Sequence, residues 1–215
     1  MFGRPTSLYP AGQTLPGRET LAWDLPARHR VLGTPLLASL ADDSAPEGYE
    51  VAYFGLGCFW GAEEMFWQIP GVYSTAVGYQ GGTTLNPTYD EVCSGRTNHT
   101  EAVRVVFDPA VVGYDDLVKR FFEVHDPTQG MRQGNDVGTQ YRSALYYVSP
   151  EQRKTAEQLT AMYGEELARR GLGHITTEIR EAPVFYPAEP LHQQYLDAHP
   201  DGYRCHANTG VPFPG

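Results

Sequence analysis

The sequence contains no long apolar run and few cysteines. No segment approaches the roughly 18 consecutive apolar residues of a transmembrane helix, and residues 1–30 hold no apolar core of a signal peptide. Three cysteines, an odd number, do not form the disulfide framework typical of small secreted proteins. We therefore expect a cytoplasmic protein without a membrane span, in which a disulfide would be transient and catalytic.

Positive charge is also scarce. The chain carries 16 lysines and arginines against 26 aspartates and glutamates, a formal net charge of −10. This balance argues against nucleic acid or an anionic membrane as the main partner. The chain has no glycine-rich phosphate-binding fingerprint, and none of its seven histidines forms a His-x-x-x-His pair. We expect a monomer without a metal or a bound cofactor.

The sequence is nevertheless long enough for one globular domain. Its 215 residues are 41% hydrophobic and 20% charged, as in a folded protein with a real core. Residues 1–48 are rich in proline and glycine. We expect them to form an irregular N-terminal extension anchored by Leu21, Trp23 and Leu36-Leu37, with partial disorder as the alternative. Residues 49–200 would be the folded domain and residues 201–215 a C-terminal tail.

Hydrophobic periodicity indicates the secondary structure of the domain. It predicts strands at 49–56, 72–79, 101–107, 141–148 and 175–181, and helices at 62–69, 114–125, 149–170 and 191–198. Two polar loops separate them, one carrying Tyr89 and Cys93 and the other spanning 126–140. The order β-α-β-β-α-β predicts a single compact α+β domain: a mixed sheet covered by helices, with a ferredoxin-like α/β plait as its core.

Cys58 lies where the first strand gives way to the first helix. A helix N-terminus favours a thiolate, but its contribution of about 0.3–1 kcal/mol lowers a thiol pKa by less than one unit. Glu63 and Glu64, expected in the first turn, would offset part of that gain. A nucleophilic Cys58 therefore needs further help, either on the thiol or on its electrophile. The alternative is a buried, inert cysteine.

Glu101 is a candidate general acid. Alternation along the third strand places it on the same face as Val103, Val105 and Phe107, with Arg104 opposite. A carboxyl group in register with a buried face is desolvated, which raises its pKa and favours the protonated form. The alternative is that Glu101, at the first residue of the strand, points into solvent.

Other candidate groups lie in the loops and the tail. The phenols of Tyr89 and Tyr141 can donate to a developing oxyanion, and Asp136 is either a binding group or a turn residue. Cys205 has basic neighbours, Arg204 and His206, which would favour its thiolate. Cys58 and Cys205 therefore suggest a nucleophile and a resolving thiol, whereas Cys93 is interpreted as a bystander in its loop.

Short segments in a fixed order resemble one enzyme family, peptide methionine sulfoxide reductase A. They cover most of residues 50–200 and read GCFWGAE at 57–63, GVYST at 71–75, GYQGG at 78–82, NPTY at 86–89, HTEAV at 99–103, HDPT at 125–128, QGNDVGTQYRS at 133–143 and HQQYL at 192–196. The resemblance implies an α+β reductase of methionine S-sulfoxide, free or in oxidised proteins.

The resemblance also implies a role for each candidate residue. Cys58 would attack the sulfoxide sulfur while Glu101 protonates the oxygen, and Tyr89 and Tyr141 would hold that oxygen. The remaining roles concern binding and resolution: Phe59 and Trp60 would enclose the S-methyl group, Asp136 would accept the substrate's amide N–H, and Cys205 would form a disulfide with Cys58 that thioredoxin or another dithiol reduces.

One feature departs from the family pattern. Several relatives have a glycine-rich tail with two cysteines, whereas the tail here contains only Cys205.

Two other classes of protein remain open. A thiol peroxidase or disulfide oxidoreductase would not need Glu101, and a non-catalytic module binding oxidised or apolar peptides through Phe59 and Trp60 would need neither an acid nor a second thiol.

Overall fold

A six-stranded mixed sheet forms the centre of the molecule. The computed structural model describes residues 6–10, 12–37 and 45–215, and its sheet has the strand order β7-β6-β1-β3-β2-β8. All neighbouring strands are antiparallel except the parallel pair β6–β7. The strands are β1 (Glu50–Leu56), β2 (Val72–Gln80), β3 (Thr100–Phe107), β6 (Ser143–Tyr147), β7 (Glu178–Glu181) and β8 (Tyr186–Pro187).

The four inner strands form the predicted plait. Helix α1 (Phe59–Trp67) connects β1 to β2, and helix α3 (Tyr114–Val124) lies between β3 and β6. In space the strands follow the order β6-β1-β3-β2. This is the arrangement of a β-α-β-β-α-β unit, in which each crossover helix packs on the same face of the sheet. The prediction of one α+β domain with a mixed sheet is confirmed.

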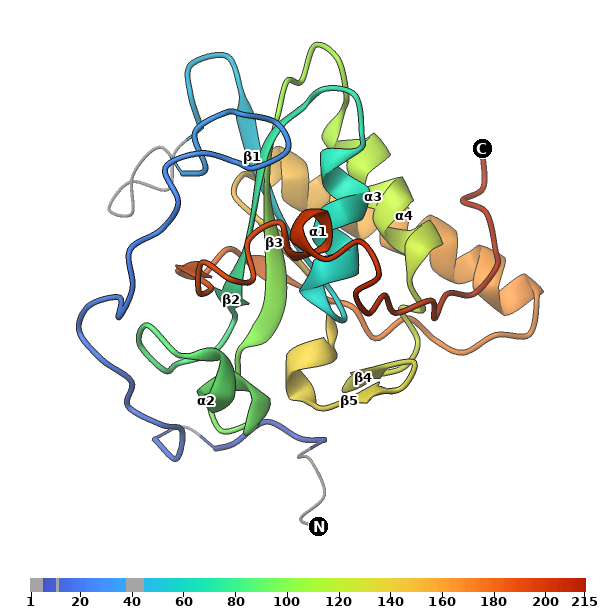
Figure 1. Cartoon of the computed structure of the whole chain (residues 1–215). Coiled ribbons are helices and arrows are strands. Elements are labelled where there is room, and N and C mark those ends of the chain that lie inside the picture. The colour runs from blue at the N-terminus through green and yellow to red at the C-terminus, as the bar shows by residue number, and fades with distance from the viewer. Residues whose placement is uncertain (1–5, 11, 38–44) are drawn as a thin grey trace.

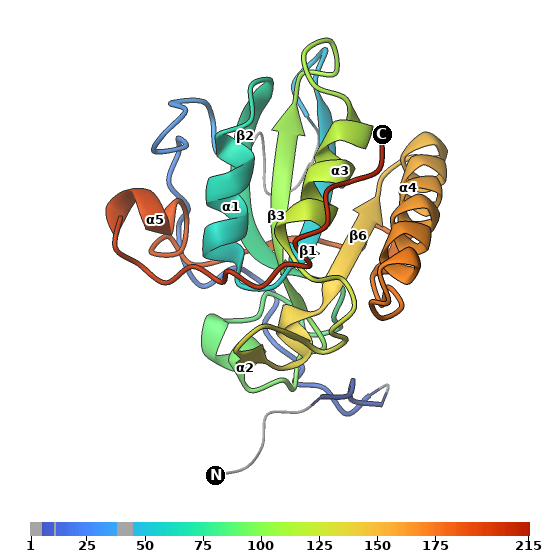
Figure 2. The ribbon, with the colours of Figure 1, turned by 90° about the vertical axis from the view of Figure 1, so that its right-hand side faces the viewer.

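Helices α1, α3 and α4 (Pro150–Arg169) cover one face of the sheet (Figures 1 and 2). Helix α3 buries Leu117, Val118, Phe121 and Phe122, the apolar stripe at helical spacing. Helix α4 begins at Ser149, whose hydroxyl accepts the N–H of Gln152, with a proline at the first helical position. Among the described helices, none combines the length and the apolar character needed to cross a bilayer.

The N-terminal extension covers the opposite face of the sheet (Figure 1). Leu36 is buried against Tyr53 and Tyr146, and Leu25 and Leu37 pack beside it. Arg104 of β3, on the face opposite Glu101, is therefore only 1% exposed. Both faces of β3 are buried, so alternation alone could not distinguish the face that carries the chemistry.

Several predicted boundaries were wrong. Helix α1 begins at Phe59, three residues before the predicted start, and the last predicted helix is only α5 (Tyr195–Ala198). The loop that carries Tyr89 and Cys93 contains helix α2 (Tyr89–Cys93), which a capping box of Thr88 and Glu91 stabilises. Loop 126–140 contains the hairpin β4–β5 and a 3-10 turn, η1, and strand β8 was missed. These elements are too short to show a hydrophobic period. Their bounds are β4 (Arg132–Gln133), β5 (Asp136–Val137) and η1 (Thr139–Tyr141).

A buried polar network joins α1 to the extension and to the segment before α5. The Glu63 carboxylate accepts hydrogen bonds from the Thr75 hydroxyl (2.9 Å) and from the backbone and side-chain N–H groups of Gln194 (2.8 and 2.7 Å). His29 Nδ1 accepts two backbone N–H groups, so Nε2 carries the proton and donates to Thr75. Burial raises the pKa of Glu63 to about 7 despite these donors.

We expect Glu63→Gln to destabilise the fold, and more so in acid. The amide NH2 would replace a carboxylate oxygen that accepts an N–H of Gln194, so two donors would face each other, at a cost of about 1–3 kcal/mol. The folded-state pKa of Glu63 lies above its unfolded value, so the stability it contributes is lost as pH rises toward about 7. Urea unfolding at pH 5 and pH 8 should therefore show the deficit of Glu63→Gln shrinking by about 2–3 kcal/mol. The exposed Glu165→Gln controls for the loss of one carboxyl, and a deficit that grows with pH would contradict this explanation.

Candidate active site

Cys58 is the N-cap residue of α1, and only Gly57 separates it from the end of β1. Gly57 makes this turn possible, because its φ of +98° disfavours any side chain and a Cβ there would lie 2.8 Å from the Gln133 side chain. The backbone N–H groups of Trp60 and Gly61 interact with the sulfur and lower its pKa. The turn therefore directs the positive end of the helix toward the thiol.

Glu101 lies beside Cys58, as its position in the sheet requires. Strands β1 and β3 pair with Phe54 opposite Val103, and continuing this register brings Leu56 opposite Glu101. The Glu101 side chain is 2% exposed, and its Oε2 accepts the backbone N–H of Phe59 at 2.9 Å. The alternative of a solvent-facing Glu101 is thus excluded, and the carboxyl and the thiol share one helix N-terminus.

The thiol of Cys58 is held in its protonated form at rest. Burial raises its pKa, the neighbouring Glu101 carboxylate and Asp136 raise it further, and the N–H groups of Trp60 and Gly61 only partly oppose them. Glu63 and Glu64 were expected to act from the first helical turn. Because α1 begins at Phe59, they lie in the second turn, and their carboxylates are bound elsewhere.

Three tyrosines lie near Glu101. Tyr79 pairs with Glu101 across β2 and β3, while Tyr89 comes from α2 and Tyr141 from η1. Burial first, and the charge of Glu101 in addition, raise the pKa of Tyr89 and Tyr141, so both hydroxyls remain protonated hydrogen-bond donors. Cys93 is the last residue of α2, the helix that Tyr89 begins, and it also contributes to the raised pKa of Tyr89. It therefore lies on a helix beside the site and not in a loop.

Phe59 and Trp60 belong to an aromatic cluster that His192 organises. The His192 ring lies 5.4 Å from that of Phe59 and 4.5 Å from that of Tyr89, and its Nδ1 accepts the Trp60 indole N–H at 3.1 Å. The ring of Tyr195 stacks on Trp60 at 3.9 Å. Burial lowers the pKa of His192, which keeps its acceptor nitrogen unprotonated. The motif alone assigns no role to His192, because the partners of its ring lie more than 100 positions away in the sequence.

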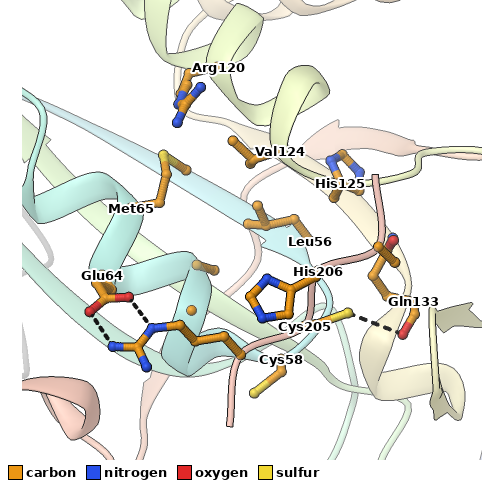
Figure 3. A pocket seen from close by; sticks show the side chains of 14 residues that line it. Leu56, Cys58, Glu64, Met65, Arg120, Val124, His125, Gln133, Cys205 and His206 are labelled. Carbon is orange, nitrogen blue, oxygen red and sulfur yellow. Dashed lines mark hydrogen bonds and ion pairs between the residues drawn. The ribbon is translucent and has the colours of Figure 1, made fainter. Parts of the chain in front are cut away.

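Cys205 and Cys58 line one cavity of about 210 Å³, together with Gln133 and His206 (Figure 3). The Cys205 thiol donates to the Gln133 carbonyl at 3.5 Å, and all three cysteines are free thiols. The tail therefore brings the two predicted thiols to the same opening. In this resting arrangement the Cys205 sulfur is bound to the β4–β5 hairpin.

The residues before Cys205 fix the tail to the domain. The Arg204 guanidinium donates twice to the Glu64 carboxylate, at 2.6 and 2.7 Å, as the dashed lines at Glu64 in Figure 3 show. Arg204 was expected to favour the Cys205 thiolate, but its charge is instead paired with α1. The Tyr203 hydroxyl donates to Asp136 Oδ2 at 3.0 Å, so a tail residue contacts the predicted amide acceptor.

Comparison with known proteins identifies the family. The sequence profile described as "Peptide methionine sulfoxide reductase" matches residues 50–212. Peptide methionine sulfoxide reductase MsrA of Rhodospirillum centenum is 56% identical over 217 aligned residues, which cover 100% of this chain and 95% of that protein. The chain belongs to the peptide methionine sulfoxide reductase family.

Solved structures agree with this reductase assignment. Methionine sulfoxide reductase A of Corynebacterium diphtheriae is 47% identical, with a TM-score of 0.85 over 97% of this chain and 100% of that one. Mxr1 of Saccharomyces cerevisiae in complex with Trx2 is 25% identical, with a TM-score of 0.50 over 73% of this chain and 94% of that chain. The resemblance found in the sequence motifs is confirmed at the level of family and fold.

Glu101→Gln tests two expected effects of this carboxyl, as an acid in sulfoxide reduction and as a charge beside the thiol. Loss of the acid should lower the rate of sulfoxide reduction by about 10²- to 10⁴-fold. Loss of the negative charge should lower the pKa of the Cys58 thiol, since that charge opposes the thiolate. We expect Cys58 in the variant to be alkylated by iodoacetamide faster than in wild type at pH 7–8, measured by site-resolved mass spectrometry. Slower alkylation in a folded variant would contradict the electrostatic coupling.

Proposed function

We propose that this reductase converts methionine S-sulfoxide, free and in proteins, to methionine, with Cys58 as nucleophile and Glu101 as general acid. The observation that carries the proposal is that both groups meet at the N-terminus of α1, where Glu101 accepts the N–H of Phe59. Without the acid, the helix terminus alone would not activate the reaction, because it lowers the pKa of a thiol by less than about one unit.

In the first step, the Cys58 sulfur bonds to the sulfoxide sulfur while Glu101 transfers a proton to the oxygen. The S–O bond then breaks, the hydroxyl passes to Cys58, and methionine leaves. The thiol and the sulfoxide thus become a sulfenic acid and a thioether: the sulfoxide sulfur is reduced and the Cys58 sulfur is oxidised. Tyr89 and Tyr141 donate hydrogen bonds to the oxygen as its charge develops.

Binding groups lie on either side of this centre. The aromatic cluster, with Phe59 buried and Trp60 fixed by His192, offers an apolar wall for the S-methyl group. Asp136 would accept the amide N–H of the substrate. In the resting arrangement the Tyr203 hydroxyl donates to the same carboxylate, so it competes with that N–H.

Cys205 resolves the sulfenic acid in the second step. The Cys205 sulfur bonds to the Cys58 sulfur while the S–O bond breaks, and the hydroxyl leaves as water with the proton of the Cys205 thiol, which forms a Cys58–Cys205 disulfide. A thioredoxin-like dithiol then reduces the disulfide by exchange, so no bound cofactor is needed. The shared cavity of the two thiols supports this pairing, and the complex of yeast Mxr1 with Trx2 supports the donor.

We place this cycle in a monomer in the reducing cytoplasm, with 49–200 as the reductase domain, 1–48 as its extension and 201–215 as the resolving tail.

The mechanism predicts how much methionine one chain releases without a reductant. Reduced protein mixed with the S-sulfoxide of a blocked methionine, without reductant, should yield about one methionine per chain. Peptide mapping should show Cys58 linked to Cys205 and Cys93 still free. Cys205→Ser should also release about one methionine but retain a sulfenic acid on Cys58. A linkage to Cys93 would overturn the choice of resolving thiol, and no methionine from folded protein would favour a peptide-binding module.

The Arg204–Glu64 ion pair should affect only the second step. Loss of the guanidinium frees the chain next to Cys205, so Arg204→Ala should slow disulfide formation several-fold without changing the first release of methionine. Rapid mixing with quenching by a thiol reagent separates the two rates. Arg170→Ala, which removes a comparable pair with Glu166 on α4, is the matched control. An equal slowing of both steps would assign Arg204 to the fold and not to resolution.

A further inference from the structure

A second cavity lies beside the aromatic cluster and does not include either thiol. Its volume is about 570 Å³, and it lies between the N-terminal extension, α2 and the segment that leads into α5. Trp23 of the extension, Trp60 and Tyr195 provide its aromatic walls, Leu191 an apolar edge, and Asp90 and Glu189 its carboxylates. The proposed reaction uses Trp60 but assigns no role to this cavity.

The cavity shares three side chains with the site where the sulfoxide is expected. Trp60, Tyr89 and His192 line it, and the same three side chains form the aromatic cluster beside Cys58. Consecutive Cα atoms of a bound peptide are about 3.8 Å apart. A side chain next to methionine sulfoxide in a protein substrate can therefore enter this cavity while the sulfoxide stays at Cys58.

The charges around the cavity have one sign. Asp90, in the first turn of α2, is exposed at its edge. Glu189 accepts the N–H of Tyr89 and the hydroxyl of Tyr79, which fixes its carboxylate in place. Among the described residues that line the cavity there is no lysine or arginine, and burial lowers the pKa of His192, so its imidazole is neutral near pH 7.

Aromatic walls combined with carboxylates suit one class of side chain. Lysine and arginine lay their aliphatic stems on apolar surface and keep the charged end in a polar environment. A cation is also attracted to the faces of tryptophan and tyrosine rings. An acidic side chain would meet Asp90 and Glu189 with no compensating positive charge, and a purely apolar one would leave the negative charge of these carboxylates uncompensated.

We propose that this cavity binds the side chain of a lysine or arginine that neighbours methionine sulfoxide in the substrate protein. The proposal rests on the proposed function, since it needs the sulfoxide at Cys58. It gives the N-terminal extension a role in substrate choice, through Trp23.

Blocked dipeptide substrates test the proposal. Pairs in which methionine S-sulfoxide is preceded or followed by lysine, alanine, leucine or glutamate are compared by kcat/KM with a saturating dithiol reductant. We expect lysine to exceed alanine by about two- to fivefold in at least one order, and glutamate to fall below alanine. Asp90→Asn and Trp23→Ala should each bring the lysine-to-alanine ratio toward one, whereas Trp23→Phe, which keeps an aromatic face, should retain most of it.

The control variant distinguishes the cavity from the negative charge of the whole protein. Glu151→Gln removes a carboxylate from the first turn of α4, which does not line the cavity, and should leave the ratio unchanged. An equal loss of preference in Glu151→Gln would overturn the proposal, as would equal rates for lysine and alanine in both orders, or leucine reduced as fast as lysine. Failure to reduce any of the peptides would instead refute the proposed function itself.

Discussion

One helix N-terminus holds two acids in this reductase. Glu101 accepts the N–H of Phe59, while the N–H groups of Trp60 and Gly61 interact with the sulfur of Cys58. Burial and the neighbouring carboxylate raise the pKa of the thiol, so the pair carries one negative charge more readily than two. In the proposed reaction, Cys58 must lose one proton and Glu101 must deliver one proton to the sulfoxide oxygen. Proton transfer within the pair produces both reactive forms without changing the charge of the site.

Helix α1 also connects this pair to the segments outside the plait. Trp60 donates to His192, Glu63 binds Gln194, and Glu64 binds Arg204 of the tail. Two successive turns of one helix thus fix the aromatic wall, the segment before α5 and the approach to the proposed resolving thiol. Downstream of Cys205, the ring of Phe213 stacks on Tyr163 of α4. The tail is held on both sides of its cysteine, which explains why a free thiol in a glycine- and proline-containing segment lies at a defined place.

The sequence indicated the fold and the proposed pair, Cys58 and Glu101, because both depend on local signals. The strand-to-helix change at Cys58 and the alternation around Glu101 are visible within ten residues of each. The predicted position of Glu63 and Glu64 in the first turn was wrong, because an N-cap cysteine is an unusual helix start and periodicity alone predicts a start three residues too late. The partner of Arg204 could not be found, because it lies 140 positions away and nothing local specifies it.

Cys58 and Glu101 lie close together because of the register between β1 and β3, and the sequence alone does not specify that register. Strands β1 and β3 are adjacent in space but not in sequence, so no hairpin turn sets their pairing. Once Phe54 pairs with Val103, the end of β1 must lie at the start of β3, and the helix that follows β1 must begin beside Glu101. A shift of one residue would turn Glu101 to the face that the N-terminal extension covers, where Arg104 now lies. The apolar packing of both faces therefore does more than stabilise the sheet: it holds Glu101, the proposed acid, beside Cys58, the proposed nucleophile.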